Sequence, residues 1–155
     1  MNRWIALALF LLAAFGVAAI GGLATASSVS DWYLTLKKPT WNPPSWVFGP
    51  AWTFLYIVMS VAAWRVWIRR EQPGAKTLLK IHAAQLILNA LWSILFFGMR
   101  RPDLALINIL ILLGLLIVMQ LRLFRFDRAA AYLWLPYLGW VTFATLLNKT
   151  IWLLN

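Results

Sequence analysis

The sequence has no cysteine, and charged residues make up only 12% of its 155 residues, of which four are carboxylates; there is one histidine. The lack of cysteine excludes disulfides and thiolate metal sites. Hydrophobic residues reach 63%, at a mean hydropathy of +0.79. A soluble domain of this length cannot bury so much apolar surface, and a disordered chain requires low hydrophobicity. These absences leave an integral membrane protein.

Catalytic and nucleic-acid-binding patterns are also missing. The four acidic residues are scattered, so they form no paired carboxylates or catalytic triad, and the chain has no glycine-rich nucleotide loop. Its 14 Lys and Arg residues give a net charge of +10 but lie in short clusters between long uncharged stretches. That pattern is typical of loops between membrane spans rather than of a nucleic-acid surface. We expect no nucleic-acid partner, no metal and no cofactor.

Five uncharged runs of 18 to 22 residues divide the chain. Each is long enough to cross a bilayer as a helix, and each is continuously apolar rather than alternating, which excludes a barrel. The sequence predicts an all-α integral membrane protein, a five-transmembrane-helix bundle that forms a single domain over residues 1–155. The predicted helices cover residues 5–26, 46–68, 79–99, 103–124 and 128–152, and 27–45 is a connecting loop. The first run is longer than a signal-peptide core, so we expect a retained helix.

Basic residues are distributed unevenly between the two ends of the predicted bundle. Nine lie on the side of the N-terminus and five on the side of loop 27–45. The positive-inside rule then places the N-terminus in the cytoplasm and loop 27–45 outside. We expect a multi-pass protein of a bacterial cytoplasmic membrane. The single histidine, His82, starts the third span, where we expect its polar tip to lie among lipid headgroups.

Tryptophan is unusually abundant, with 11 residues, and most of them lie near span ends, as in an interfacial aromatic belt. Trp52, Trp92 and Trp140 lie deeper and share helical faces with polar or aromatic residues. These faces are Phe48, Trp52 and Tyr56; Gln85, Asn89, Trp92 and Phe96; and Tyr137, Trp140, Ala144 and Leu147. Because amides are costly toward lipid, the Asn89 face is expected to point inward.

The three faces could form an aromatic-walled cavity for a flat, largely apolar ligand, or they could simply pack helices together. The spacing alone favours neither interpretation. A further stripe of small residues in the first span, namely Ala14, Ala18, Gly22 and Ala26, allows close helix approach. Its partner is either inside the bundle or in a second protomer.

Specific strings in the chain resemble a known family. Lys38-Pro39-Thr40-Trp41-Asn42-Pro43-Pro44 is followed by Phe48-Gly49-Pro50-Ala51-Trp52, and Pro136-Tyr137-Leu138-Gly139-Trp140 lies in the last span. Together they are similar to the signature of the tryptophan-rich sensory protein and translocator protein family, also known as peripheral-type benzodiazepine receptors. The resemblance runs over nearly the whole chain.

The resemblance implies a five-helix bundle, often a homodimer, that binds protoporphyrin IX or related tetrapyrroles, isoquinoline or benzodiazepine drugs, and sterols. Transferred to this sequence, the ligand-binding residues are Tyr33, Pro43, Phe48, Trp52, Asn89, Trp92, Phe96, Trp140, Ala144 and Leu147. Asn148 is followed by Lys149 and Thr150, so the tyrosine of the short sterol motif is missing, and we expect porphyrin rather than sterol as the ligand.

Two alternatives to a sensory, ligand-binding function remain. One is light- and oxygen-dependent porphyrin degradation, with Trp52 and Trp140 as the catalytic residues; the other is porphyrin or lipid transport, for which the spans offer no charged coupling site.

Overall fold

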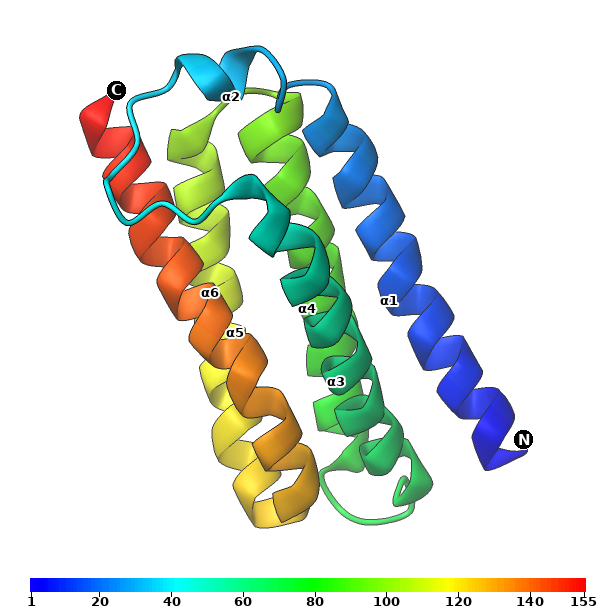
Figure 1. Ribbon diagram of the computed structural model, residues 1–155. Helices are drawn as coiled ribbons and strands as arrows, with labels where there is room; N and C mark the ends of the chain where they lie inside the picture. The colour runs from blue at the N-terminus through cyan, green and yellow to red at the C-terminus, as the bar shows by residue number, and fades with distance from the viewer.

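The computed structural model describes residues 1–155 as a bundle of long helices with no strand (Figure 1). Five helices are long and apolar enough to cross a membrane. They are α1 (Arg3–Ala26), η1 with α3 (Ser45–Val47 and Phe48–Ile68), α4 with η2 (Ala75–Ser93 and Ile94–Gly98), α5 (Pro102–Phe126) and α6 (Arg128–Leu154); a short helix, α2 (Trp32–Thr35), lies in the first connection. The predicted fold class is confirmed.

The helix ends follow local chemistry, and the bounds differ from the predicted ranges by at most four residues. The Asn2 side chain caps α1 by accepting from the Trp4 amide at 2.7 Å. Pro44 directly precedes η1, and Pro102 occupies the first turn of α5, where its missing N–H has no cost. Gly74 turns the chain into α4 with a φ of +90°, a conformation that glycine adopts without strain.

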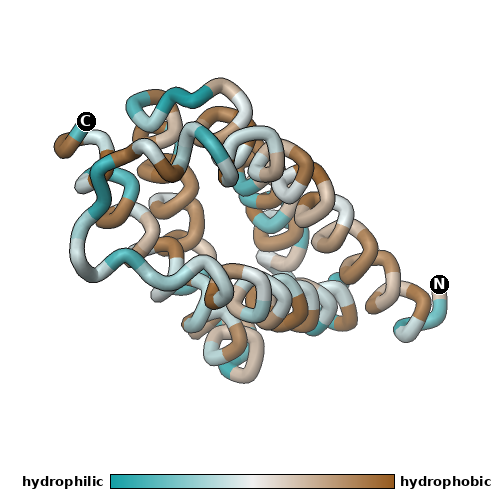
Figure 2. The backbone as a smooth tube through the Cα atoms, turned by 45° about the horizontal axis from the view of Figure 1, so that its top comes forward, coloured by the Kyte–Doolittle hydropathy of each residue, from teal (hydrophilic) through white to brown (hydrophobic).

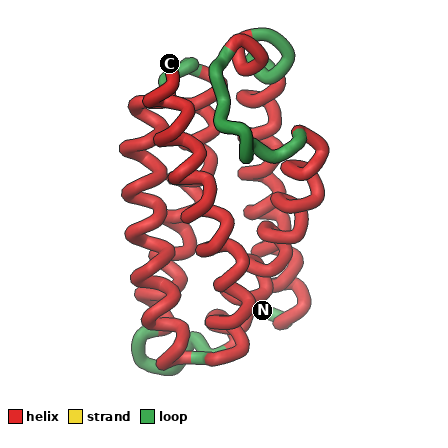
Figure 3. The backbone as a smooth tube through the Cα atoms, turned by 60° about the vertical axis from the view of Figure 1, so that its left-hand side comes forward, coloured by secondary structure: helices red, strands yellow, loops and turns green.

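The helices form a closed ring of neighbours. The helix α1 packs against α3 and α4, α3 against α6, α6 against α5, and α5 against α4. Figure 2 shows this ring from the end that carries the C-terminus, with brown helices running between more hydrophilic connections. Loops occur only at the two ends of the bundle (Figure 3). Segment 27–45 and the C-terminus lie at one end and the N-terminus at the other (Figure 1).

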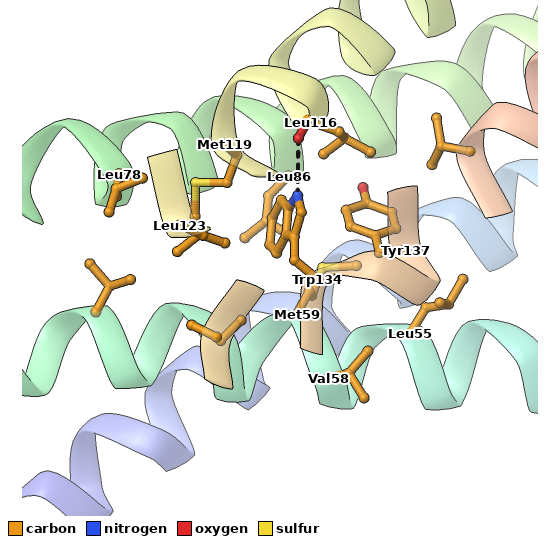
Figure 4. Close-up of a cluster of buried hydrophobic side chains, with 14 of the residues drawn as sticks. Leu55, Val58, Met59, Leu78, Leu86, Leu116, Met119, Leu123, Trp134 and Tyr137 are labelled. Carbon is orange, nitrogen blue, oxygen red and sulfur yellow. Dashed lines mark hydrogen bonds between the residues drawn. The ribbon is translucent and has the colours of Figure 1, made fainter. Parts of the chain in front are cut away.

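The half of the bundle nearer the N-terminus is filled by apolar side chains. Trp134, Leu116, Met119 and Met59 are completely buried there, as Figure 4 shows. The Trp134 indole donates to the Leu116 carbonyl at 3.3 Å, which satisfies its only polar atom. Because side chains fill this half of the bundle, a cavity between the helices has room only in the other half.

A buried carboxylate joins three helices at the N-terminal end. Asp127, between α5 and α6, accepts from Arg65 Nε of α3 at 2.6 Å, and Arg69 Nη1 lies 3.2 Å from its other oxygen. The Arg65 hydrogen bond holds the pKa of Asp127 below its usual value, against the opposing effect of burial. The outer faces of the helices are apolar, with Leu12 67% and Leu23 77% exposed on α1. This is an integral, multi-pass membrane protein.

Candidate functional site

A cavity of about 490 Å³ lies between the helices in the half of the bundle beneath segment 27–45. All five long helices contribute to its wall, and no charged residue does. Nine of the ten residues expected to bind ligand line it: Tyr33, Phe48, Trp52, Asn89, Trp92, Phe96, Trp140, Ala144 and Leu147. Pro43 is not on this wall. It lies in the irregular segment that precedes η1, next to Pro44, the N-cap residue of that helix.

Two tryptophans from separate helices converge on one side of the cavity. The ring centroids of Trp52 (α3) and Trp140 (α6) are 6.4 Å apart at an interplanar angle of 80°. Phe48 meets Trp140 edge to face at 6.0 Å. The packing of α3 against α6 produces this arrangement, which the periodicity of the two faces predicts. Phe48, Trp52 and Trp140 from these two faces line the same cavity.

The opposite wall is made where α4 widens into a π-helical turn, η2. Trp92 and Phe96 stack there with centroids 5.0 Å apart and an interplanar angle of 24°. The Trp92 indole donates to Asn148 Oδ1 at 2.9 Å, and Asn148 Nδ2 donates to the Pro102 carbonyl at 3.0 Å. A single π-helical turn changes the direction of the following side chains, and such turns are frequent at functional sites.

The floor of the cavity is polar. Tyr56 Oη donates to Asn89 Oδ1 at 2.8 Å, and Asn89 Nδ2 donates to Tyr137 Oη at 2.9 Å. Both Tyr56 and Asn89 line the cavity, while Tyr137 is fully buried beneath it. The prediction that the Asn89 face points inward is confirmed, and the apolar cavity has a few fixed polar groups at one end.

Sequence reasoning missed most of the contribution of α1. Ala18, Gly22 and Ala26, three members of its small-residue stripe, line the cavity, and Ala14 is fully buried. This side of α1 therefore faces the cavity. Gly21 brings α1 close to α4, since a Cβ there would lie 3.1 Å from Ser93 Oγ.

Segment 27–45 forms a roof that is tied down at both sides. The Asn155 side chain makes two hydrogen bonds with the backbone of Lys37, at 3.1 and 2.9 Å. Ser28 donates to the Phe97 carbonyl and accepts from Arg100 Nε at 3.1 Å. These ties depend on contacts between distant segments, so no local pattern could have revealed them.

Two further side chains shape the roof above the cavity. Lys38 Nζ donates to the Tyr33 carbonyl at 2.7 Å and lies 4.6 Å from the centroid of the Tyr33 ring. Burial raises the pKa of Tyr33, so this cavity residue stays a neutral phenol.

The expectation for His82 is wrong. Its side chain is not in the headgroup region but is only 3% exposed, between the rings of Phe10 and Trp134 at 5.9 and 6.1 Å. The physical reason is that α4 begins four residues earlier than predicted, at Ala75, which moves His82 two turns into the bundle.

Known proteins resemble this chain along nearly its full length. The model of the TspO/MBR family matches residues 8–153. A tryptophan-rich sensory protein of Cereibacter sphaeroides is 42% identical, covering 100% of this chain and 95% of the relative. The tryptophan-rich protein TspO of Archaeoglobus fulgidus is 39% identical over 94% of both chains, and the human translocator protein is 38% identical over 78% of this chain and 73% of its own. With its five apolar helices and the matching family strings, this chain belongs to the TspO/MBR family.

Proposed function

We propose that this protein is a membrane receptor that binds flat tetrapyrroles, such as protoporphyrin IX, in the cavity between its helices. The observation that carries the proposal is the convergence of Trp52, Trp92 and Trp140 on one cavity without a charged lining residue. Its volume of about 490 Å³ lies within the usual range for small-molecule sites. The names of the relatives, a sensory protein and translocator proteins, support a role in sensing or moving a ligand.

The chemistry of the wall suits such a ligand. Indole faces stack on a flat aromatic ring system, and each pair adds about 0.5–1.5 kcal/mol beyond area burial. The polar groups of Tyr56, Asn89 and Asn148 can meet a polar ligand edge. The carboxylates of a porphyrin find no cation inside the cavity, so they stay at the roof, where Lys38 lies. The same properties suit isoquinoline and benzodiazepine drugs, while sterols lack the aromatic system that the wall favours.

The proposal also covers the orientation of the protein, its membrane and its oligomeric state. The nine-to-five distribution of basic residues favours a cytoplasmic N-terminus and a bacterial cytoplasmic membrane. The exposed apolar face of α1, which includes Leu9, Leu12 and Leu23, contacts membrane lipid and the second copy of a homodimer.

A titration tests the proposed site. Protoporphyrin IX added to the detergent-purified protein is expected to bind in a one-to-one ratio and to quench tryptophan fluorescence. Because each indole loses its stacking contact, Trp52→Ala and Trp140→Ala are each expected to weaken binding about tenfold. Changes in porphyrin absorbance give the affinity independently of the number of tryptophans.

The matched control is Trp152→Ala, since Trp152 is also on α6 but is 44% exposed and lies outside the cavity. It is expected to leave the affinity unchanged. Equal affinity of the wild type, Trp52→Ala and Trp140→Ala would refute the assignment of this cavity.

A second candidate function is light- and oxygen-dependent degradation of the bound porphyrin. The contact between Trp52 and Trp140 favours it, because two electron-rich indoles would lie against one ligand, and dioxygen would supply the oxidant. Illumination of the complex in air is expected to bleach the porphyrin faster than in detergent alone, and more slowly in Trp140→Phe. Equal rates in all three samples would exclude the activity.

A further inference from the structure

A chain of five buried polar side chains leads from the cavity floor into the apolar half of the bundle. Tyr56 and Asn89 line the cavity, whereas Tyr137, Gln85 and His82 lie below it. None of the five is more than 5% exposed. Because a buried polar group without a partner is costly, these side chains must satisfy one another.

The hydrogen bonds of this polar chain all point the same way. Tyr56 donates to Asn89, Asn89 donates to Tyr137, and Tyr137 donates to Gln85 Oε1 at 2.5 Å. The amide nitrogen of Gln85 therefore faces His82 Nδ1, at 3.1 Å. An amide nitrogen only donates, so His82 Nδ1 accepts and the ring proton is on Nε2.

Two features at the far end of the polar chain bear on its direction. Gln85 Nε2 lies 3.6 Å from Met59 Sδ, which favours the observed orientation of the amide. Opposing this, His82 Nε2 is buried without a hydrogen-bond partner, so the tautomer inferred from the Gln85 contact leaves its N–H unsatisfied. Transfer of the Nε2 proton to a water molecule that returns a proton to Nδ1 gives the other neutral tautomer and removes the unsatisfied donor.

That change would reverse every hydrogen bond in the chain. A protonated Nδ1 needs the Gln85 oxygen, the Gln85 nitrogen then donates to Tyr137, and Tyr137 donates to the Asn89 oxygen. The Asn89 nitrogen then donates to Tyr56, and the hydroxyl hydrogen of Tyr56 turns toward the cavity. In the direction inferred from the heavy-atom geometry Tyr56 offers lone pairs to a ligand, and in the reversed direction it offers a donor.

We infer that His82, acting through Gln85, Tyr137 and Asn89, is a positioning residue that determines whether the cavity floor accepts a ligand with a hydrogen-bond donor or one with only an acceptor. The inference rests on the proposed function of the cavity. The direction of the hydrogen bonds then selects the ligand. A flat aromatic molecule with an N–H or O–H group at its edge can donate to Tyr56 without any change in the chain. A molecule with only an acceptor can hydrogen-bond to Tyr56 only after the chain reverses.

The single histidine makes the test direct. In protein labelled with ¹⁵N-histidine, the ligand-free wild type is expected to show one neutral tautomer with the proton on Nε2. The variant Tyr137→Phe interrupts the polar chain and is expected to give a mixture of tautomers. The control Tyr132→Phe, on the same helix but with a 62% exposed tyrosine, is expected to match the wild type. A ligand-free wild type with the proton on Nδ1, or an unaltered spectrum in Tyr137→Phe, would overturn the inference.

Two matched ligands test the polarity. The wild type is expected to bind 2-naphthol, which has an O–H donor, about tenfold or more tightly than 2-methoxynaphthalene. Bound 2-methoxynaphthalene is expected to shift the histidine signal toward the Nδ1 tautomer. Naphthalene, which has no acceptor oxygen, is expected to leave the histidine signal unchanged. In His82→Phe and in Tyr137→Phe the two affinities are expected to become nearly equal. An unchanged ratio in both variants refutes the role of His82, whereas failure of protoporphyrin IX to bind refutes the proposed function alone.

Discussion

Asp127 shows at the scale of one residue how this protein uses its few carboxylates. Its side chain is 6% exposed and contacts Arg65 and Arg69, which are 35% and 40% exposed. Asp127→Asn is expected to lower the free energy of unfolding by about 1 kcal/mol at neutral pH, because the arginines are partly screened by solvent. Thermal unfolding of the detergent-purified protein measures this loss.

The pH dependence of this contribution follows from the direction of the pKa shift. The folded-state pKa of Asp127 lies below its unfolded value, so its contribution is complete above about pH 5 and is lost as the pH falls below about 4. Wild type and Asp127→Asn should therefore converge in stability as the pH falls through the folded-state pKa of Asp127. The control Asp103→Asn removes an exposed pair with Arg101 and should change stability less. A difference between wild type and Asp127→Asn that persists unchanged at low pH would contradict this account.

Residues in and around the cavity differ in how well the sequence predicts them. Trp52, Asn89 and Trp140 could be assigned, because helical periodicity and the cost of placing an amide toward lipid both turn them inward. Ser28 and Arg100 could not, because their positions depend on how segment 27–45 folds back over distant helices. His82 was misplaced, since the start of α4 depends on a glycine turn rather than on hydropathy.

At the scale of the element, α1 carries two adjacent glycines with different surroundings. A Cβ at Gly21 would lie 3.1 Å from Ser93 Oγ, while one at Gly22 would meet no atom within 4 Å. Gly21→Leu is expected to cost about 1–3 kcal/mol through overpacking against α4. Gly22→Leu is expected to leave the melting temperature nearly unchanged and to weaken porphyrin binding about tenfold, because it narrows the cavity.

Melting curves and porphyrin titrations of the two glycine variants check both expectations. A Gly22→Leu protein that binds protoporphyrin as well as the wild type would show that α1 is not part of the binding wall.

The helices themselves were predictable from uncharged length alone, because a bilayer fixes how many residues a spanning helix needs. Helix α2 and the π-helical turn η2 were not, since neither leaves a signal in hydropathy.

At the scale of the whole molecule, the absence of cysteine permits a clean test of orientation. Ser27→Cys and Gln72→Cys place single thiols at exposed positions on opposite ends of the bundle. A membrane-impermeant maleimide added to intact bacterial spheroplasts is expected to label Ser27→Cys and to spare Gln72→Cys until the membrane is opened. The reverse pattern would invert the proposed topology.

The roof of the cavity is expected to control ligand exchange. Arg100→Ala removes the hydrogen bond to Ser28 and the pair with Asp31, at 3.1 and 3.4 Å, so dissociation of protoporphyrin should become about three- to tenfold faster. Stopped-flow displacement measures this rate. Arg101→Ala, which lacks such a tie, is the control, and equal rates for both variants would show that the tie does not limit exchange.

The pairing between Asn155 and the Lys37 backbone has a practical consequence for work with this protein. An affinity tag or fluorescent fusion attached at Asn155 would disturb the two hydrogen bonds between the Asn155 side chain and the Lys37 backbone, which hold the roof to α6. Residence times measured on such a fusion would then be shorter than those of the untagged protein. A tag at the opposite terminus, beyond Asn2, would leave this fastening undisturbed.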